Sequence, residues 1–589
     1  MKFIKYIGLG LFVSALLTFI SLIFISTYEI TDQNLEGWSE SFDEGNKAYL
    51  TEALTELKGQ HFGNKFSYFS ALKGAFSKAN EAINQEYGVD PSTLSSAADL
   101  AIAKAGSGPI TLSEELHTAA KEVLPEGIHK TISDYTSWMI GREYADKEEL
   151  SSAIQEQFGV AANAYVSSLQ VGNTKEYLFQ ASKLTAKGIF WDHKYTFFLL
   201  IVVLGSFGAL VYIFPAFFDG MPGIKHNGIY FSSASNRGLI GILAGIFLVS
   251  FYILLYFFHH YIAEWITLMD PVAYALRGEE ASQWFMYGFL YTLAIVVMGL
   301  RMFAKYRHSN YHKVRTASII FFQMAFAFII PQILYQLNLP DSDLKNAWPL
   351  NYYFFFDWNI TKHISSGTFG VFMFVWGTVL TVIGIPVLTY FFGKRWYCSW
   401  VCGCGGLAET LGDPYRQLSD KSLTAWNIER YLIHAVLVFA VGMTGLVLYT
   451  YFSGASNIGF LNSFKVREIY GFAIGSIFAG VIGTGFYPFM GNRVWCRFGC
   501  PLAAYLGLVQ RFKSRFRITT NGGQCISCGN CSTYCEMGID VRWYAQRGQN
   551  VVRSSCVGCG VCAAVCPRGV LALENGPNTD VSRMNEVKY

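Results

Sequence analysis

The spacing of eight cysteines near the C-terminal end is the feature that most constrains this chain. Four of them form the run Cys525-x-x-Cys528-x-x-Cys531-x-x-x-Cys535. The other four form the run Cys556-x-x-Cys559-x-x-Cys562-x-x-x-Cys566, which Pro567 follows. Cysteines separated by two residues on a short loop can each reach a different corner of one metal centre. The two runs therefore predict a small domain whose fold depends on metal–thiolate bonds.

Paired runs with this spacing are typical of two 4Fe-4S clusters, each held by three thiolates of one run and the fourth of the other. We expect one cluster on Cys525, Cys528, Cys531 and Cys566, and the second on Cys556, Cys559, Cys562 and Cys535. The alternatives are zinc knuckles or a disulfide scaffold, but zinc sites usually show two distant Cys pairs. Glu536 stands where a proline usually follows the fourth cysteine, a change that we expect to affect the loop rather than ligation.

Composition indicates a membrane protein. Hydrophobic residues make up 52% of the 589 residues and charged residues only 15%, whereas soluble proteins carry about a quarter charged residues. All 13 cysteines lie between Cys398 and Cys566, which excludes a disulfide-stapled domain in the N-terminal part. The predicted fold is mostly α: a polytopic helix bundle of about eight spans, with an outer helical domain and a C-terminal two-cluster ferredoxin-like domain.

Apolar runs and composition shifts set the predicted domains. Residues 1–26 form an N-terminal membrane anchor, with a cleaved signal peptide as the alternative, although the run is long and no A-x-A-like site follows it. Residues 27–194 form the outer domain, 195–515 the transmembrane domain, 516–575 the ferredoxin-type domain and 576–589 a tail. The seven spans after the anchor are expected at about 195–217, 238–262, 284–304, 316–337, 367–392, 430–452 and 469–490.

Charge predicts how the chain is oriented. Residues 27–194 hold 14 Lys/Arg against 24 Asp/Glu. The same residues are expected to be helical, because Phe69, Leu72 and Phe76 recur at helical spacing. Breaks between helices are expected at Pro91 and at residues 106–109. Short loops on the predicted inside, Lys225 and Arg237 among them, hold 12 Lys/Arg against 5 outside. This asymmetry places the acidic domain outside a bacterial-type inner membrane and the ferredoxin region in the cytoplasm.

A basic belt follows the last predicted span. It consists of Arg493, Arg497, Arg511, Lys513, Arg515 and Arg517. We expect it to contact anionic lipid headgroups.

A second set of cysteines lies at the ends of two spans. The sequence Gly-x-Arg-x-aromatic-Cys-x-aromatic-x-Cys occurs once at Cys398 and Cys402 and again at Cys496 and Cys500. On a helix, residues four apart share a face, so four thiols could meet at the membrane edge. They would form an iron–sulfur or copper site or a redox dithiol pair, or they are small residues that allow close packing. Cys404 is either a further ligand or a bystander.

Histidines near span ends are weaker candidates. His259 and His260 lie near the outer end of the third span, and His434 near the inner end of the seventh. Because these ends are on opposite membrane faces, a shared haem is disfavoured. A quinone site or an interfacial position is the remaining interpretation.

At these motifs the chain resembles the membrane polyferredoxins of the NosR/NapH type, to which CcoG-like accessory proteins are related. The resemblance covers about residues 316–575 and rests on both membrane-edge motifs, both ferredoxin runs and Gly538-Ile539-Asp540-Val541. Gly403 replaces the proline of the first motif, and the flavin-attachment Ser-Gly-Ala-Thr is absent.

The resemblance implies electron transfer between cytoplasmic or quinone-pool donors and a partner redox protein. An electron-transfer subunit is then expected rather than a stand-alone enzyme, with quinone and membrane lipid as further partners and no nucleic acid. The alternatives are a copper-handling or copper-reducing accessory factor for a respiratory metalloenzyme, and a redox-sensing regulator.

Overall fold

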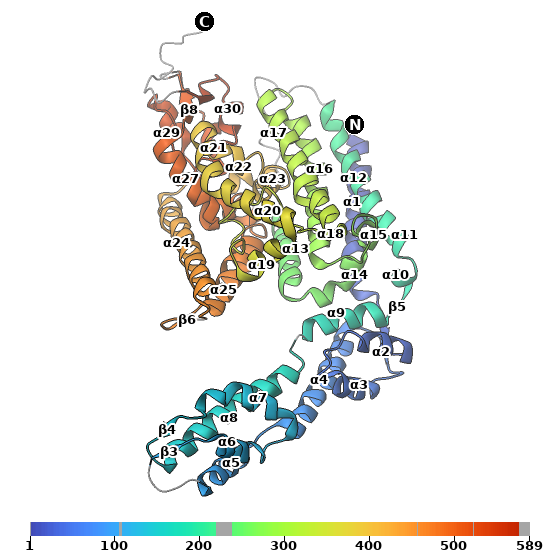
Figure 1. Cartoon of the computed structure of the whole chain (residues 1–589). Helices are drawn as coiled ribbons and strands as arrows, with labels where there is room; N and C mark the ends of the chain where they lie inside the picture. The colour runs from blue at the N-terminus through green and yellow to red at the C-terminus, as the bar shows by residue number, and fades with distance from the viewer. Residues whose placement is uncertain are drawn as a thin grey trace. The chain divides into compact units, whose positions relative to one another are not determined.

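The computed structural model describes residues 2–104, 109–172, 174–218, 238–455, 457–521 and 524–576 (Figure 1). The chain divides into two compact units. The first comprises Met1–Phe19, Tyr195–Phe258 and Trp265–Tyr589, and the second comprises Ile20–Lys194 and His259–Glu264. Lys225, Arg237, residues 106–108 and nearly all of the predicted tail lie outside the described residues.

Seven helices of the described chain are long and apolar enough to cross a membrane. They are Lys2–Phe24, Lys194–Phe217, Leu239–Phe257 (α13), Gln283–Lys305 (α16), Asn310–Gln336, Gly367–Phe392 and Leu423–Ser453 (α24). Within the protein, only 22–33% of the most apolar stretch of each helix is buried. Apolar side chains that face outward along a whole helix suit a lipid environment, so the protein is a multi-pass membrane protein.

Several of these helices are composite. Lys2–Phe24 joins α1 (Lys2–Ser21) and η1 (Leu22–Phe24), and Lys194–Phe217 joins α11 (Lys194–Phe198), η4 (Leu199–Val203), α12 (Leu204–Ile213) and η5 (Phe214–Phe217). Asn310–Gln336 joins α17 (Asn310–Phe321), η7 (Phe322–Ile329) and α18 (Ile330–Gln336). Gly367–Phe392 joins α20 (Gly367–Val379), η8 (Leu380–Gly384) and α21 (Ile385–Phe392).

The predicted span 469–490 differs from the other seven. It is divided between α25 (Ser463–Tyr470), η10 (Gly471–Ile482) and α26 (Tyr487–Met490). The start of this helix is charged, because it contains Lys465, Arg467 and Glu468. The helix ends at Ile482, shortly before Pro488. The continuous apolar part is therefore shorter than the sequence pattern indicated.

Short helices connect the spans of the first unit. They are η6 (His259–Ile262), α14 (Ala263–Thr267), α15 (Asp270–Arg277), α19 (Asp357–Ser365), α22 (Arg395–Cys398), α23 (Gly403–Glu409), η9 (Asp413–Leu418) and η11 (Trp495–Gly499), with the hairpin β6 (Asn457–Ile458) and β7 (Leu461–Asn462). Residues His259–Glu264 at the start of this set belong to the second unit.

The C-terminal part is a small domain built on one β-ribbon. After α27 (Pro501–Lys513), strand β8 (Phe516–Thr520) pairs antiparallel with β9 (Leu571–Asn575), with Phe516 opposite Asn575. Between the strands lie α28 (Asn530–Thr533), α29 (Val541–Gln546) and α30 (Val561–Ala564). Phe516, Ile539 and Val541 share one hydrophobic core with residues of the membrane-edge motifs.

The second unit is helical. It contains α2 (Asp32–Ser39), α3 (Lys47–Thr55), α4 (Lys65–Tyr87), α5 (Pro91–Ala103), α6 (Glu114–Lys121), η2 (Glu126–Ile128), α7 (His129–Thr136), η3 (Ser137–Met139), α8 (Lys147–Leu169), α9 (Thr174–Thr185) and α10 (Ile189–Asp192). Two small sheets accompany them, β2 (His61–Phe62)–β1 (Thr27–Glu29)–β5 (Ala186–Lys187) and β3 (Ile110–Thr111)–β4 (Glu143–Tyr144).

The helical spacing predicted in this unit is confirmed. Phe69, Leu72 and Phe76 lie on one buried face of α4, and Pro91 begins α5. A proline suits the first turn of a helix because its missing N–H would have no partner there.

Candidate functional site

The two C-terminal cysteine runs fold into matching loops. The third cysteine of each run is the second residue of a short helix, Cys531 in α28 and Cys562 in α30. A glycine with a left-handed backbone precedes each helix: Gly529 has a φ of 80° and Gly560 a φ of 81°. The fourth cysteine of each run accepts a backbone N–H from the residue four positions later. Ile539 donates to Cys535 Sγ (3.4 Å) and Val570 donates to Cys566 Sγ (3.3 Å). The loops therefore present their thiols in the same way.

Cysteines from both runs surround one cavity. Its lining includes Cys525, Cys528 and Cys531 of the first run and Cys566 of the second. This is the set predicted to hold the first cluster, and packing of α28 against α30 brings its members together. Cys528 is exposed, so this edge of the domain is open to solvent.

The second predicted set lies deeper. Burial raises the pKa of Cys562 well above its ordinary value, and the nearby charges of Cys556 and Cys535 raise it further. Cys535, from the first run, thus lies beside cysteines of the second run. Cys556 and Cys562 are buried, and Cys559 faces a buried cluster of charged residues.

The spacing of the thiols distinguishes between metal centres. A single zinc ion binds thiolates at about 2.3 Å, which would place the sulfurs within about 4 Å of one another. Among the described residues, which include all 13 cysteines, no three cysteine sulfurs lie within 4.8 Å of one another. A cubane carries its ligands on four separate iron corners and needs the wider spacing. The residues present therefore fit 4Fe-4S clusters better than single ions.

A buried cluster of charges, which we call the arginine–carboxylate network, lies beside these cysteines. It consists of Arg315, Arg416, Arg493, Glu409 and Glu536, each no more than 1% exposed. Glu409 lies at ion-pair distance from all three arginines: 3.0 Å, 2.6 Å and 2.8 Å from Arg315, Arg416 and Arg493. Glu536 lies 2.7 Å from Arg416 and 3.2 Å from Arg493.

The network contacts both sets of cysteines. Arg416 Nη1 lies 3.8 Å from Cys559 Sγ, and Arg315 donates to the carbonyl oxygen of Cys559. On the other side, Arg493 Nη1 lies 3.6 Å from Cys496 Sγ and donates to the carbonyl oxygen of Cys398 (3.0 Å). One continuous set of buried charges thus joins the ferredoxin domain to the membrane-edge motifs.

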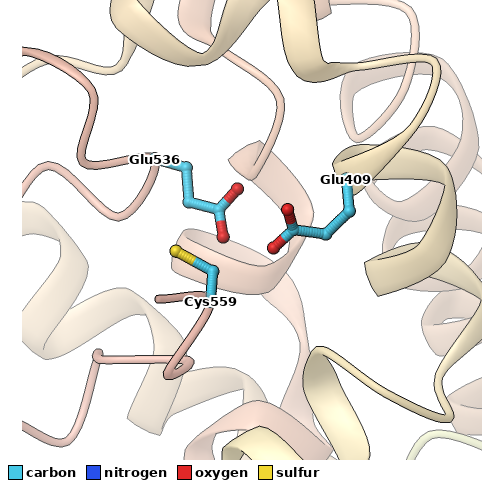
Figure 2. Close-up of side chains that lie close together, drawn as sticks. All are labelled: Glu409, Glu536 and Cys559. Atoms are coloured by element: carbon cyan, nitrogen blue, oxygen red, sulfur yellow. The ribbon is translucent and has the colours of Figure 1, made fainter. Parts of the chain in front are cut away.

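Figure 2 shows the carboxyl groups of Glu409 and Glu536 facing one another beside the thiol of Cys559. Ligand atoms of these three residues lie within 4.8 Å of one another, as a single bound ion would require. The arginines already occupy both carboxylates, however, and they hold the pKa of Glu409 well below its usual range against the effect of burial. The carboxylates are therefore best explained as partners of the arginines.

The network was not predicted from the sequence. It adds a role for Glu536 and corrects the expectation for two residues of the basic belt. Glu536 is more than a change of loop geometry, because its carboxylate binds two arginines. Arg493 and Arg497 do not face lipid: both are buried, and Arg497 pairs with Glu429 at 2.6 Å. Glu409 and Arg416 are seven positions apart, but the other partners lie far apart in the sequence. The one signal that stood out was a charged residue at a position where proline is usual.

The membrane-edge motifs repeat in structure but not as single helices. Cys398 ends α22 and Cys402 precedes α23, whereas Cys496 lies in η11 and Cys500 precedes α27. Each motif bends before its second cysteine, because the backbone of Cys402 and Cys500 is extended. The expectation that residues four apart share a helix face is therefore wrong here.

These four thiols are nonetheless buried in one hydrophobic core. Burial raises the pKa of Cys398 to about 12, with Lys394 opposing this rise and the neighbouring Cys402 and Cys496 adding to it. Cys500 Sγ accepts the N–H of Ala503 (3.3 Å). Cys404 is half-buried and its thiol hydrogen-bonds Cys402. The four cysteines of the repeat therefore lie near one another in the structure.

The candidate histidines lie in different units. His260 is buried against the rings of Phe69 and Tyr261 in the second unit. His434 lies on α24 in the first unit.

Comparison with protein families places iron–sulfur domains on both cysteine regions. A family described as "4Fe-4S dicluster domain" matches residues 511–570. A family described as "4Fe-4S binding domain" matches twice, at residues 372–422 and 470–519, so that each copy contains one membrane-edge motif. The chain therefore carries 4Fe-4S domains of ferredoxin type.

Three curated relatives share part of this chain. It is 27% identical over 160 residues to "Putative electron transport protein YccM" of Escherichia coli (strain K12), which covers 25% of this chain and 43% of the relative. It is 30% identical over 148 residues (24% and 48%) to "Methylamine utilization ferredoxin-type protein MauN" of Paracoccus denitrificans, and 28% identical over 169 residues (27% and 56%) to MauN of Methylobacillus flagellatus. The chain spans about half the length of these relatives. No solved structure matches the chain.

Proposed function

We propose that this protein is a membrane-bound electron-transfer protein of the NosR/NapH type. It passes electrons between cytoplasmic or quinone-pool donors and a partner redox protein. The observation that carries this proposal is the arginine–carboxylate network, which joins the cysteines of the ferredoxin domain to those at the membrane edge. The proposal is also supported by the relatives, one of which is named an electron transport protein and two of which are named ferredoxin-type.

Two 4Fe-4S clusters would supply one-electron chemistry, since each can gain and lose an electron. The chain's residues would hold them as two sets of four thiolates, Cys525, Cys528, Cys531 and Cys566, and Cys556, Cys559, Cys562 and Cys535. Backbone N–H groups at Ile539 and Val570 point at two of these sulfurs and stabilise negative charge there.

Exposure indicates where electrons enter or leave. Cys528 of the first set is exposed, whereas Cys556 and Cys562 of the second are buried. A soluble partner would therefore exchange electrons at the first set. The second set lies between that surface and the membrane edge, because the network contacts Cys559 on one side and Cys496 on the other.

We assign a third metal centre to Cys398, Cys402, Cys496 and Cys500. This assignment is supported by the duplicated family match and by burial of all four thiols. An iron–sulfur cluster is preferred to a copper ion because the matching family is described as 4Fe-4S binding. A copper-handling factor is the second candidate, because four converging buried thiols also suit Cu(I).

The test is metal analysis of the full-length protein after anaerobic purification. We expect Cys398→Ser combined with Cys496→Ser to lower the iron and sulfide content by the amount in one 4Fe-4S cluster. The copper content of this double variant should equal that of the wild-type protein. The control, Cys404→Ser, should retain all the iron. If the double variant keeps full iron, the membrane-edge cysteines are a dithiol or packing residues. If wild-type protein binds copper that the double variant loses, the copper-handling function is favoured instead.

A further inference from the structure

A cavity of about 600 Å³ opens beside both cysteine regions. Residues at the start of α24, residues of α27 and the loop before Cys556 form its walls. Cys496 of the membrane-edge motif and Met537, two residues after Cys535, also line it. His434, a candidate for a quinone site, lines it as well.

The charge of the cavity is strongly positive. Its only acidic lining residue is Glu429, which already pairs with Arg497 at 2.6 Å. Four further cations line it and, within the described chain, have no carboxylate within 4.0 Å: Lys394, Arg430, Arg511 and Arg553. A cavity with this excess of positive charge attracts an anion.

Lys394 is the strongest single indication. It is only 1% exposed, and its ammonium donates one hydrogen bond, to the carbonyl oxygen of Ser554 (3.3 Å). A lysine ammonium has three hydrogens to donate. The charge of Lys394 also acts on the nearby thiol of Cys398. Its remaining hydrogens can be donated to an anionic ligand in the cavity.

Aromatic side chains place the cavity at a membrane boundary. The guanidinium of Arg553 lies 5.0 Å above the ring of Trp426, and Tyr431 is 72% exposed. Both aromatic residues lie in the first turns of α24, one of the helices able to cross a membrane. Phe512, next to Arg511, is also exposed. Aromatic and basic residues together are typical of the headgroup region.

We propose that this cavity binds the phosphate of an anionic phospholipid headgroup, with Lys394 deepest and Arg511 and Arg553 nearer the opening. The apolar residues beside the opening would contact the acyl chains. The proposal does not depend on electron transfer. It would make the lipid a structural ligand between the membrane-edge motif and the ferredoxin domain.

The experiment measures binding of short-chain phosphatidylglycerol to the purified full-length protein in a neutral detergent. We expect at least tenfold weaker binding after Arg511→Gln combined with Arg553→Gln. The matched control is Arg547→Gln, because Arg547 is exposed and lies over Trp543 at 4.0 Å but does not line the cavity. Arg511→Lys combined with Arg553→Lys should restore most of the binding, and iron content should report intact folding.

Three results would overturn the proposal. Equal affinity for short-chain phosphatidylcholine would show that the headgroup charge is not recognised. An equal loss of affinity in Arg547→Gln would show a general effect of surface charge. If glycerol 3-phosphate binds as tightly as the lipid, the cavity is a site for soluble phosphate esters and the lipid assignment is wrong.

Discussion

Glu536 gives the position after the fourth cysteine of the first run an electrostatic role. Its carboxylate binds Arg416 and Arg493, and Arg416 also lies 3.8 Å from Cys559 Sγ. Charges this close to a cluster ligand act through a buried, weakly polarisable medium. The residues of the network would therefore influence how readily a cluster held by Cys559 accepts an electron.

This role predicts that removing the negative and the positive charge will shift the reduction potential of the cluster in opposite directions. Glu536→Gln removes a negative charge, so it should raise the reduction potential of the cluster held by Cys535, Cys556, Cys559 and Cys562. Arg416→Gln removes a positive charge and should lower that potential. Redox titration followed by EPR measures both. Glu468→Gln, at an exposed site on α25, is the control, and shifts of the same sign in both network variants would contradict the account.

At the level of elements, the two cysteine loops use the same backbone geometry in different surroundings. Gly529 and Gly560 both have a φ near 80°. An added Cβ at Gly529 would have no atom closer than 3.9 Å, whereas at Gly560 it would lie 2.7 Å from the ring of Tyr311. The first loop is open at this position, and the second is pressed against helix α17.

Alanine at these two glycines should therefore have unequal effects. Gly529→Ala adds only the cost of a left-handed backbone, about 1–2 kcal/mol. Gly560→Ala adds a clash with Tyr311 and should cost more, with partial loss of iron from the second run. Thermal unfolding and iron content of the two full-length variants measure this difference. Equal losses in both variants would mean that the contact with α17 is unimportant.

At the scale of the whole molecule, the chain has a predicted orientation in the membrane. The charge asymmetry of the loops predicts that residues 27–194 face the outside and that the ferredoxin domain faces the cytoplasm. Protease added to intact spheroplasts should therefore cleave the second unit and spare the C-terminal domain. In inverted membrane vesicles the pattern should reverse. Cleavage of the ferredoxin domain in spheroplasts would show the opposite orientation.

The sequence allowed the helical class, seven of the spans and the packing face of α4 to be predicted, because long apolar runs and helical spacing are local signals. The duplicated membrane-edge motif was recognised, but not its bend before Cys402 and Cys500, which depends on tertiary packing. The arginine–carboxylate network could not be predicted. Glu409 and Arg493 are 84 positions apart, and Arg416 and Glu536 are 120 apart. One sequence does not indicate which of its many charged residues form ion pairs over such separations.

In the proposed function, this chain carries electrons on two ferredoxin-type clusters. The most direct measurement is a reductive titration with dithionite of the anaerobically purified full-length protein, followed by EPR with iron and sulfide analysis of the same sample. We expect reducible 4Fe-4S signals. Those of the two ferredoxin-type clusters should disappear in Cys559→Ser combined with Cys528→Ser, and the signal of the centre assigned to Cys398, Cys402, Cys496 and Cys500 should remain. Full iron and sulfide content without any dithionite-reducible signal would contradict the account.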